Sequence, residues 1–384
     1  MVECEDRSPQ QSSDHRELFA RVEYDFMAEL MKSPEGLQHR NTLLRQGELI
    51  TILSKLSKDI RNARQPLDKK VDRLKRFLAD PKNDLLSIDP PLPLPLDPTV
   101  LIVGVFPEES NVFKSSLNPL KMTFKKSDGT KYPLLFKTGD DLRQDQLVIQ
   151  IIMLMDRLLK NENLDLKLSP YHILATAPYA GAVQFVPSTP LANIDSILNF
   201  LKRNNPDPKA PLGVRKETME TYIKSCAGYC VITYILGVGD RHNDNLLLSP
   251  NGNFFHADFG FILGRDPKPF APLMKLSALM VDGMGGVNHE YYDQFKQYCF
   301  TAYASLRKSA NLILNLFALM IEANIPDIRV EPDKAVQKVQ ERFLLEKSDQ
   351  EAVKDFEAQI EGSLNAMMPV VIDQLHGFVQ KFRG

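Results

Sequence analysis

Apolar side chains recur with a helical period in the first eighty residues of the chain. Leu53, Leu56 and Ile60 follow one another at steps of three or four residues, and charged side chains occupy most positions between them. This spacing is typical of amphipathic helices that bury one face. The pattern predicts helices over residues 16–78, and the polar residues 1–15 before them are expected to be disordered.

A proline-rich stretch, residues 90–96, follows the helical pattern. Prolines and leucines alternate over most of it. Because proline fixes φ and removes a backbone donor, we expect an extended, polyproline II-like linker. Docking of an SH3-type partner is an alternative, but the position between two structured segments favours a plain spacer. Residues 16–90 are therefore interpreted as a helical segment with its linker.

Short runs of strand-forming residues replace the helical pattern from residue 99. Residues 100–105, 121–125 and 132–136 predict strands separated by turn residues. One long helix is predicted over residues 145–160, where apolar positions repeat at helical spacing. This region, residues 91–186, is expected to form a small lobe made of a sheet and a helix.

Helical patterns dominate again beyond residue 193. A helical block is predicted over residues 291–324, and the chain closes with an amphipathic stretch over residues 361–382. We therefore expect an α+β protein whose second lobe, residues 187–384, is larger and mainly helical.

Composition excludes some classes of function. The chain has 384 residues, which suggests about two domain-sized units, and 47 basic against 49 acidic side chains give a net charge of −2. This balance gives no support to nucleic-acid binding. No apolar stretch near the N-terminus resembles a signal peptide. The longest uncharged run, residues 168–194, is interrupted by prolines and cannot be a spanning helix.

The cysteines indicate a reducing, cytosolic compartment. There are four of them and no Cys-x-x-Cys motif. Cys226 and Cys230 lie one helical turn apart and could share a metal ion. No second closely spaced pair of Cys or His follows, so small core residues on an apolar helix are the better interpretation.

The strongest chemical signal lies near the middle of the chain. Residues 239–245 read Gly-Asp-Arg-His-Asn-Asp-Asn, and the triplet Asp258-Phe259-Gly260 follows after a strand-like run. Phosphoryl transfer requires an acceptor hydroxyl to be oriented and deprotonated, and metal ions to neutralise the phosphates. A loop with a carboxylate, an imidazole and an amide oxygen, together with a second carboxylate, supplies these groups. The combination predicts ATP-dependent phosphoryl transfer with a divalent metal ion.

Three blocks of sequence resemble one family. Protein kinases write this loop as His-Arg-Asp, whereas here it reads Asp240-Arg241-His242, the order found in the phosphatidylinositol kinase superfamily. Residues 136–146, Phe-Lys-Thr-Gly-Asp-Asp-Leu-Arg-Gln-Asp-Gln, resemble the ATP-lysine segment of phosphatidylinositol 3-kinases. Residues 264–269, Gly-Arg-Asp-Pro-Lys-Pro, continuing to Met-Lys-Leu at 274–276, resemble the activation loop of the class III phosphatidylinositol 3-kinases.

The resemblance implies a bilobal, protein-kinase-like fold. Residues 91–186 would form the N-lobe and hinge, residues 187–384 the C-lobe with its C-terminal amphipathic helix, and residues 16–90 a remnant of the helical domain that precedes the kinase domain. The membrane-binding C2 domain of the family has no counterpart in this sequence, so we expect a fragment or a truncated form.

The resemblance also implies an activity and its setting. The γ-phosphate of ATP would pass to the 3-hydroxyl of phosphatidylinositol with the help of Mg²⁺ or Mn²⁺. The enzyme would be cytoplasmic and peripheral on endosomal and autophagic membranes, with roles in endosomal trafficking and autophagy. A kinase-like regulatory subunit and a beclin-type coiled-coil protein are the implied partners.

ATP is expected to contact residues of both lobes. Lys137 would reach the α-phosphate, Asp145 would hold Lys137 or line the pocket, and residues 113–116 would cover the phosphates in place of a glycine-rich loop. Ala257 departs from the family, where a larger Ile usually stands, which predicts weaker ATP affinity or altered inhibitor fit. The residues assigned to ATP are Phe113, Lys114, Ser115, Leu135, Lys137, Asp145, Tyr171, Gln184, Phe185, Val186, Leu247 and Ala257.

Two residues of the loop compete for the role of general base. Asp240 has the spacing of the protein-kinase catalytic Asp relative to Asn245, and His242 has a side chain whose unperturbed pKa is near neutral. The resemblance favours His242 near the acceptor, with Asp240 orienting it or sharing the role. Asn245 and Asp258 are the expected metal ligands. Asp244 is expected to support them, and the loop arginine to pair within the loop.

Residues 261–275, called the acceptor segment below, should read the substrate. Their cations Arg265, Lys268 and Lys275 are assigned to the lipid, and so modest a positive charge suits an acceptor with one diester phosphate. The C-terminal amphipathic stretch offers an apolar face for the membrane, with ordinary core packing as the alternative.

Three other activities remain open. A phosphatidylinositol 4-kinase would differ in the hydroxyl that it phosphorylates, and a protein kinase of the same superfamily would differ in its acceptor. An inactive binding scaffold is disfavoured because every expected catalytic position is filled.

Overall fold

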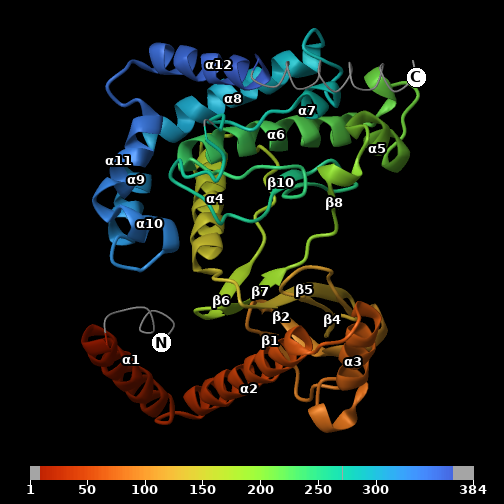
Figure 1. The fold of residues 1–384 in the computed structure, drawn as a ribbon, viewed down its shortest axis with the longest axis vertical. Helices are drawn as coiled ribbons and strands as arrows, with labels where there is room; N and C mark the ends of the chain where they lie inside the picture. Colours follow the sequence, from red (N-terminus) through yellow and green to blue (C-terminus); the bar gives the residue numbers. More distant parts are fainter. Residues whose placement is uncertain (1–8, 270, 366–384) are drawn as a thin grey trace. The chain divides into compact units, whose positions relative to one another are not determined.

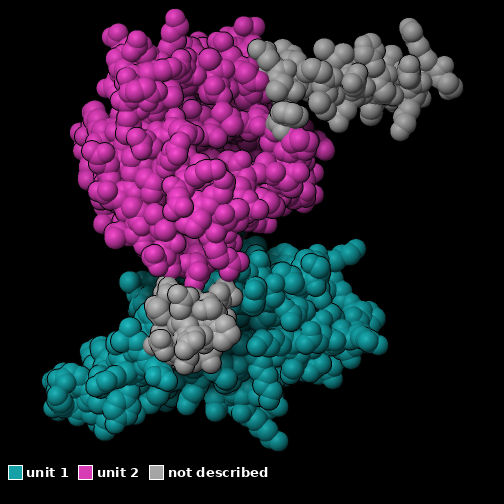
Figure 2. Space-filling view, turned by 60° about the vertical axis from the view of Figure 1, so that its left-hand side comes forward, with its two compact units in different colours: residues 1–149, 171–186 teal, residues 150–170, 187–384 magenta. Residues whose placement is uncertain are grey.

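The structure, a computed structural model, describes residues 9–269 and 271–365 (Figure 1). The chain forms two compact units (Figure 2). Unit 1 comprises Met1–Ile149 and Tyr171–Val186, and unit 2 comprises Gln150–Pro170 and Pro187–Gly384. The helix α4, Arg143–Asn161, begins in unit 1 and ends in unit 2.

Unit 1 is built on an antiparallel sheet with strand order β1-β2-β4-β5-β7-β6, and β3 pairs with β4. Leu120, Met122 and Phe124 of β4 lie two residues apart on one face and are almost fully buried, as are Leu134 and Phe136 of β5. The predicted strands are confirmed. The strands are β1 Leu92–Leu94, β2 Asp97–Val105, β3 Asn111–Val112, β4 Leu120–Lys126, β5 Lys131–Thr138, β6 Ile173–Ala177 and β7 Ala180–Gln184.

Three helices precede this sheet, as the periodicity predicted: α1 Pro9–Leu30, α2 Pro34–Asn62 and α3 Leu67–Ala79. Ser33 caps α2 because its hydroxyl accepts the amide N–H of Gly36, and Pro34 suits the first helical position. Leu53 and Ile60 of α2 and Leu74 of α3 are buried in the same hydrophobic core as the sheet. The helices α2 and α3 are therefore part of unit 1 and not a separate layer.

The expected disorder of residues 1–15 is wrong for residues 9–15, which belong to α1. Pro9 fits the first position of a helix, and no glycine or proline interrupts the following residues up to Ser33. Polar composition alone therefore underestimated the helix propensity of this segment.

The proline-rich stretch is not a free linker, because its leucines enter the core as part of β1. Leu92 and Leu94 are 3% and 2% exposed. The strand lies at the edge of the sheet, where proline is tolerated. From α2, Arg45 and Gln46 donate to the carbonyl oxygens of Pro90 (2.6 Å) and Pro93 (2.8 Å). The alternation of Pro and Leu was a strand pattern with a period of two.

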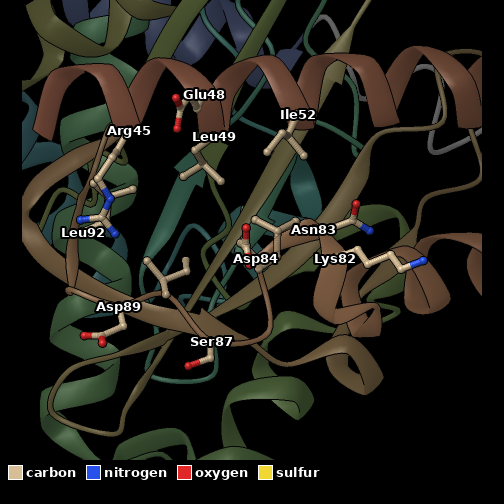
Figure 3. Close-up of a pocket in the computed structure, with 12 residues that line it drawn as sticks. Arg45, Glu48, Leu49, Ile52, Lys82, Asn83, Asp84, Ser87, Asp89 and Leu92 are labelled. Atoms are coloured by element: carbon tan, nitrogen blue, oxygen red, sulfur yellow. The ribbon is translucent and has the colours of Figure 1, made fainter. Parts of the chain in front are cut away.

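Residues 82–92 and the middle of α2 enclose a pocket of about 560 Å³ within unit 1 (Figure 3). Glu48, Leu49 and Ile52 of α2 form one wall, and residues such as Asp84 and Asp89 form the other. None of the residues assigned from the sequence lines this pocket.

Unit 2 is mainly helical and has a small antiparallel sheet with strand order β10-β9-β8. The helix α6, Lys216–Leu236, is buried over most of its length and packs against α8, Glu290–Lys308. The strands are β8 Thr189–Pro190, β9 Leu246–Leu248 and β10 Phe254–His256; the other helices are α5 Ile197–Asn204, α7 Ala278–Asp282, α9 Ala310–Leu319, α10 Pro326–Val330, α11 Pro332–Phe343 and α12 Asp349–Asn365.

The cysteines of unit 2 behave as small core residues. Cys226 and Cys230 on α6 and Cys299 on α8 are buried and free. In the part of the chain that the structure describes, no three His, Cys, Asp or Glu side chains are grouped so that they could hold a metal ion.

The structure bears on two expectations about membranes, the C-terminal amphipathic stretch and the lack of a spanning helix, only for the residues that it describes. The C-terminal amphipathic stretch was predicted over residues 361–382, and the part beyond Asn365 lies outside those residues. Over residues 9–269 and 271–365, no helix is both long enough and apolar enough to cross a bilayer.

The buried side chain of His256 should make the free energy of unfolding depend on pH. Its ring is fully buried, stacks on Tyr229 at 5.4 Å between centroids and has no hydrogen-bond partner for either nitrogen. Burial, with a smaller effect of Arg241 and Lys275, holds the pKa of His256 well below its usual range. The unfolded chain therefore binds this proton more readily, and the free energy of unfolding should fall as pH drops below about 6.5, by up to roughly 1.4 kcal/mol per pH unit.

Urea unfolding of wild type and His256→Phe between pH 5 and 8 measures this effect. Phe retains the stacking but cannot be protonated, so the acid limb should be flatter in this variant. His39→Phe, at an exposed position of α2, is the matched control. Equal acid limbs in wild type and His256→Phe would contradict the prediction.

Candidate active site

The loop after α6 is paired through its backbone with the start of the acceptor segment. The amides of Leu263 and Gly264 donate to the carbonyl oxygens of Leu236 and Gly237, both at 2.9 Å, and the amide of Gly239 donates to that of Phe261 at 3.0 Å. We call residues 236–240 and 261–266 the paired segments. Their pairing places the beginning of the Asp-Arg-His loop directly against the residues that follow Asp258-Phe259-Gly260.

Two glycines permit this close approach. Gly237 ends α6 with φ 58°, a left-handed conformation that suits glycine at a helix C-terminus. A Cβ atom at Gly237 would overlap the backbone of Gly264, and one at Gly239 would overlap the carbonyl oxygen of Arg265. Neither position can therefore carry a side chain without separating the paired segments.

Asp240 follows in a left-handed conformation with φ 52°, which is unusual for a residue other than glycine. Side chains hold its backbone on both sides. Asp266 accepts the amide N–H of Asp240 through Oδ2 at 2.7 Å, and Asn245 donates to its carbonyl oxygen through Nδ2 at 2.8 Å. A strained backbone persists only where its surroundings fix it, and such positions cluster at functional sites.

Arg241 connects the loop to the residues around Asp258. Its guanidinium donates to the carbonyl oxygens of Gly239 and Ala257, both at 2.8 Å, and to that of Asp258. The residue is only 9% exposed. Arg241 was expected to pair within the loop, and it additionally bridges the two catalytic stretches of the sequence.

His242 is oriented by its two neighbours. Its Nδ1 lies 3.5 Å from the carboxylate of Asp244, and its Nε2 lies 3.4 Å from Nδ2 of Asn245. Because Nδ2 of an amide can only donate, this arrangement favours a proton on Nδ1 and a lone pair on Nε2. A general base requires this lone pair, so the long 3.4 Å contact with Asn245 would have to be exchanged for one with the acceptor hydroxyl.

The two expected metal ligands differ in exposure. Asn245 is buried; its Oδ1 accepts the amide N–H of His242 at 3.1 Å, so the oxygen and nitrogen of its side chain cannot be interchanged. Asp258 is exposed and has a left-handed φ of 62°. A carboxylate and an amide oxygen suit Mg²⁺ or Mn²⁺, and so small a protein donor set fits a metal ion that takes its remaining ligands from phosphates and water.

Leu247 and Ala257 lie on one face of the small sheet. Leu247 of β9 is directly opposite Phe255 of β10, so their side chains share a face, and Ala257 lies two residues further along. The amide of Ala257 donates to the carbonyl oxygen of Asn245 at 2.9 Å, which continues the pairing. Both residues are half-buried, so the sequence placed two adenine-contacting candidates together.

The acceptor segment is fixed by α10 as well. Asp327, almost fully buried, accepts the amide N–H of Ile262 at 2.7 Å and forms an ion pair with Arg265. Lys268 is exposed. Burial, with a smaller contribution from the nearby Lys268, lowers the pKa of Lys275. Of the cations assigned to the lipid, Arg265 thus already has an anionic partner.

In unit 1, the end of β5 carries Lys137, whose ammonium lies 3.4 Å from the carboxylate of Asp140. The hydroxyl groups of Thr138 and Ser57, which belongs to α2, are 3.0 Å apart in a buried contact. At the next residue, Gly139 has φ 93°, and Arg61 of α2 fills the space beside it. Asp145 lies in the first turn of α4 and is half-buried.

The loop expected to cover the phosphates is held from α3. Its residues Phe113, Lys114 and Ser115 are exposed. Asn118 donates to the carbonyl oxygens of Phe113 (3.2 Å) and Ser115 (2.9 Å), and it accepts a 2.7 Å bond from the ammonium of Lys70. The sequence analysis missed both Lys70 and Asn118, although Asn before Pro is a turn signal.

The expected hinge belongs to the end of β7 and the residues after it. The amide of Gln184 donates to the carbonyl oxygen of His172 at 2.8 Å, so this amide already has an acceptor. The ring centroids of Phe185 and Phe113 are 6.1 Å apart. The ammonium of Lys121 lies over the ring of Phe185, 4.4 Å from its centroid. Leu135 is half-buried and Tyr171 is buried.

If residues 113–116 cover the phosphates as expected, substitution of Lys70 should lower the affinity for ATP. Removing its ammonium leaves Asn118 without the charged donor that orders residues 113–118, and a hydrogen bond to a charged group contributes about 1.5–3 kcal/mol. Lys70→Met should raise the KM for ATP about fivefold or more and leave kcat within about twofold. Lys69→Met, on the exposed side of α3, is the control, and steady-state kinetics with equal KM values in the two variants would contradict the prediction.

Comparison with known proteins identifies relatives of this chain. The sequence profile of the phosphatidylinositol 3- and 4-kinase family matches residues 131–196 and 189–330. Phosphatidylinositol 3-kinase pik3 of Schizosaccharomyces pombe is 54% identical over 374 residues, which cover 95% of this chain and 47% of pik3. Phosphatidylinositol 3-kinase VPS34 of Saccharomyces cerevisiae is 53% identical over 348 residues, which cover 90% of this chain and 40% of VPS34.

A plant protein agrees with the two yeast relatives. The root isoform of phosphatidylinositol 3-kinase from Glycine max is 49% identical over 353 residues, which cover 91% of this chain and 43% of the relative. The chain thus spans less than half the length of these relatives. The matching profile covers the paired segments, Arg241 and both expected metal ligands, and we conclude that the chain belongs to the phosphatidylinositol 3- and 4-kinase family.

Proposed function

We propose that this chain is a lipid kinase that transfers the γ-phosphate of ATP to the 3-hydroxyl of phosphatidylinositol. The observation that supports it best is the joining of Asp240, His242, Asn245 and Asp258 through Arg241 and the paired segments. The names of the relatives support phosphatidylinositol as the acceptor and the 3-hydroxyl as its site.

His242 is assigned the role of general base. Its Nε2 takes the proton of the acceptor hydroxyl as the oxygen attacks the γ-phosphorus, and the carboxylate of Asp244 beside Nδ1 stabilises the cationic ring that results. Asp240 then orients the acceptor or shares the proton. Its backbone contacts do not involve its own carboxylate, so that group stays available for this role.

Asn245 and Asp258 would hold the metal ion, Mg²⁺ or Mn²⁺. When bound, the ion neutralises charge on the phosphates and so favours departure of ADP. Arg241 holds the backbone at Asp258 through the carbonyl oxygens of Ala257 and Asp258, and it ties this backbone to Gly239 at the start of the catalytic loop.

We assign ATP-contacting residues in each unit taken by itself. In unit 1, Lys137 would bind the α-phosphate, the loop at residues 113–115 would cover the phosphates, and Asp145 would hold Lys137 or line the pocket. The adenine ring would contact the buried and half-buried residues chosen from the sequence. These are Leu135, Tyr171, Gln184, Phe185 and Val186 in unit 1 and Leu247 and Ala257 in unit 2.

The acceptor must be phosphorylated at a membrane surface. Extraction of two acyl chains would cost well over ~20 kcal/mol at about 0.8 kcal/mol per methylene group. Lys268 and Lys275 would meet the headgroup, whereas Arg265 is held by Asp327 and would contribute through its remaining donors. A cytoplasmic, peripheral enzyme on endosomal and autophagic membranes, with a kinase-like regulatory subunit and a beclin-type partner, is the setting that the family resemblance suggests.

Transfer of labelled phosphate from ATP to phosphatidylinositol vesicles tests the proposed function. Wild type should label the lipid, and Asp258→Asn should lose the activity by at least about 100-fold because a metal ligand loses its charge. Phosphatidylinositol 4,5-bisphosphate vesicles and a generic protein substrate are the comparison acceptors. Preferred labelling of either would refute phosphatidylinositol as the acceptor.

The choice of base is tested by two substitutions. Asp240→Asn keeps the backbone contacts of the loop, and His242→Gln removes the imidazole. Loss of a general base typically costs about 10²–10⁴-fold in rate, so we expect His242→Gln to lower kcat by that amount and Asp240→Asn by less. A larger loss of kcat in Asp240→Asn would assign the base to Asp240.

Replacement of Ala257 by a larger apolar residue should raise the affinity for ATP. Ala257→Ile adds apolar surface to the face that Leu247 shares, and burial of each added methylene contributes about 0.8 kcal/mol. The KM for ATP should fall several-fold with little change in kcat. An unchanged KM would remove this residue from the nucleotide site.

A further inference from the structure

We propose that Asp266 is a positioning residue that couples the acceptor segment to the catalytic loop. The proposal rests on the proposed function, because it assigns a step of regulation to the same site. In its simplest form, the carboxylate of Asp266 fixes the conformation of Asp240, so phosphoryl transfer is fast only while the acceptor segment keeps its place.

Asp266 uses both of its carboxylate oxygens on backbone amides. Oδ1 accepts the amide N–H of Lys268 at 2.8 Å, which closes a local turn across Pro267. Oδ2 accepts the amide N–H of Asp240 at 2.7 Å, which lies 26 residues away in the sequence. One side chain therefore shapes the segment that carries a lipid-binding candidate and restrains the backbone of the catalytic loop.

The restraint acts where the backbone needs it. A left-handed residue other than glycine costs about 1 kcal/mol or more, and Asp240 is such a residue. Asn245 holds the carbonyl side of Asp240, and Asp266 holds its amide side. Without Asp266, the amide would lose a charge-assisted acceptor, and the loop could relax toward a conformation that displaces His242 and Asn245.

Asp207 offers a matched control within the same unit. Residues 207–209 and 266–268 have the same sequence, Asp-Pro-Lys, and in both the aspartate Oδ1 accepts the amide N–H of the lysine, at 3.0 Å in the case of Asp207. Only the contact from Oδ2 to the catalytic loop distinguishes Asp266 in this comparison. The same substitution at the two sites thus separates the local turn from the long-range contact.

The experiment compares Asp266→Asn with Asp207→Asn. An Asn side chain has a single acceptor oxygen, so it cannot accept both amides as Asp266 does. We expect Asp266→Asn to lower kcat for phosphorylation of phosphatidylinositol vesicles about 10- to 100-fold and to leave the KM for ATP within twofold. Asp207→Asn should match wild type in both constants. Asp266→Ala, which loses both bonds, should be at least as slow as Asp266→Asn.

Hydrogen exchange gives a readout that needs no substrate. Peptides covering residues 237–245 should exchange faster in Asp266→Asn than in wild type, with no change in Asp207→Asn and with thermal melting showing that all three proteins are folded. Unchanged exchange, or a kcat equal to that of Asp207→Asn, would overturn the proposal. If wild type fails to phosphorylate phosphatidylinositol, the proposed function fails, while exchange still decides whether Asp266 restrains the loop.

Discussion

The geometry of the catalytic half depends on the backbone pairing between residues 236–240 and 261–266. Apart from Leu236 at the end of α6, neither segment has regular secondary structure, and each contains left-handed residues. Glycines at 237 and 239 allow the segments to touch, and Arg241 then fastens the loop to the carbonyl oxygens around Asp258. The residues that we propose to deprotonate the acceptor, bind the metal ion and read the lipid are thereby connected within unit 2.

In unit 1, the helices α2 and α3 hold the elements to which we assign ATP contacts. Residues of α2 contact Thr138 and Gly139, which follow Lys137, and Lys70 of α3 orders the loop at residues 113–118 through Asn118. The two helices share a hydrophobic core with the sheet. The helices α2 and α3 therefore support the elements of unit 1 to which we assign ATP contacts.

The sequence predicted what is encoded locally. Asp240, His242, Asn245 and Asp258 stand at short intervals in one stretch, and the pattern of residues identified most helices and the strands β2, β4 and β5. Contacts between residues far apart in the sequence could not be predicted. Asp266 and Asp327 accept hydrogen bonds from amides 26 and 65 residues away, and no local pattern in the sequence indicates either contact. The prediction of a linker over the proline-rich stretch was wrong for a different reason. Burial of its alternate leucines in the core outweighed the preference of proline for linkers.

The position of the phosphate on the inositol ring tests the central claim most directly. The lipid product of wild type should be deacylated and its headgroup separated from the positional isomers. The account predicts that the 3-phosphate is the product from phosphatidylinositol. A 4-phosphate, or label on protein in place of lipid, would leave the fold and family standing and contradict the assigned reaction.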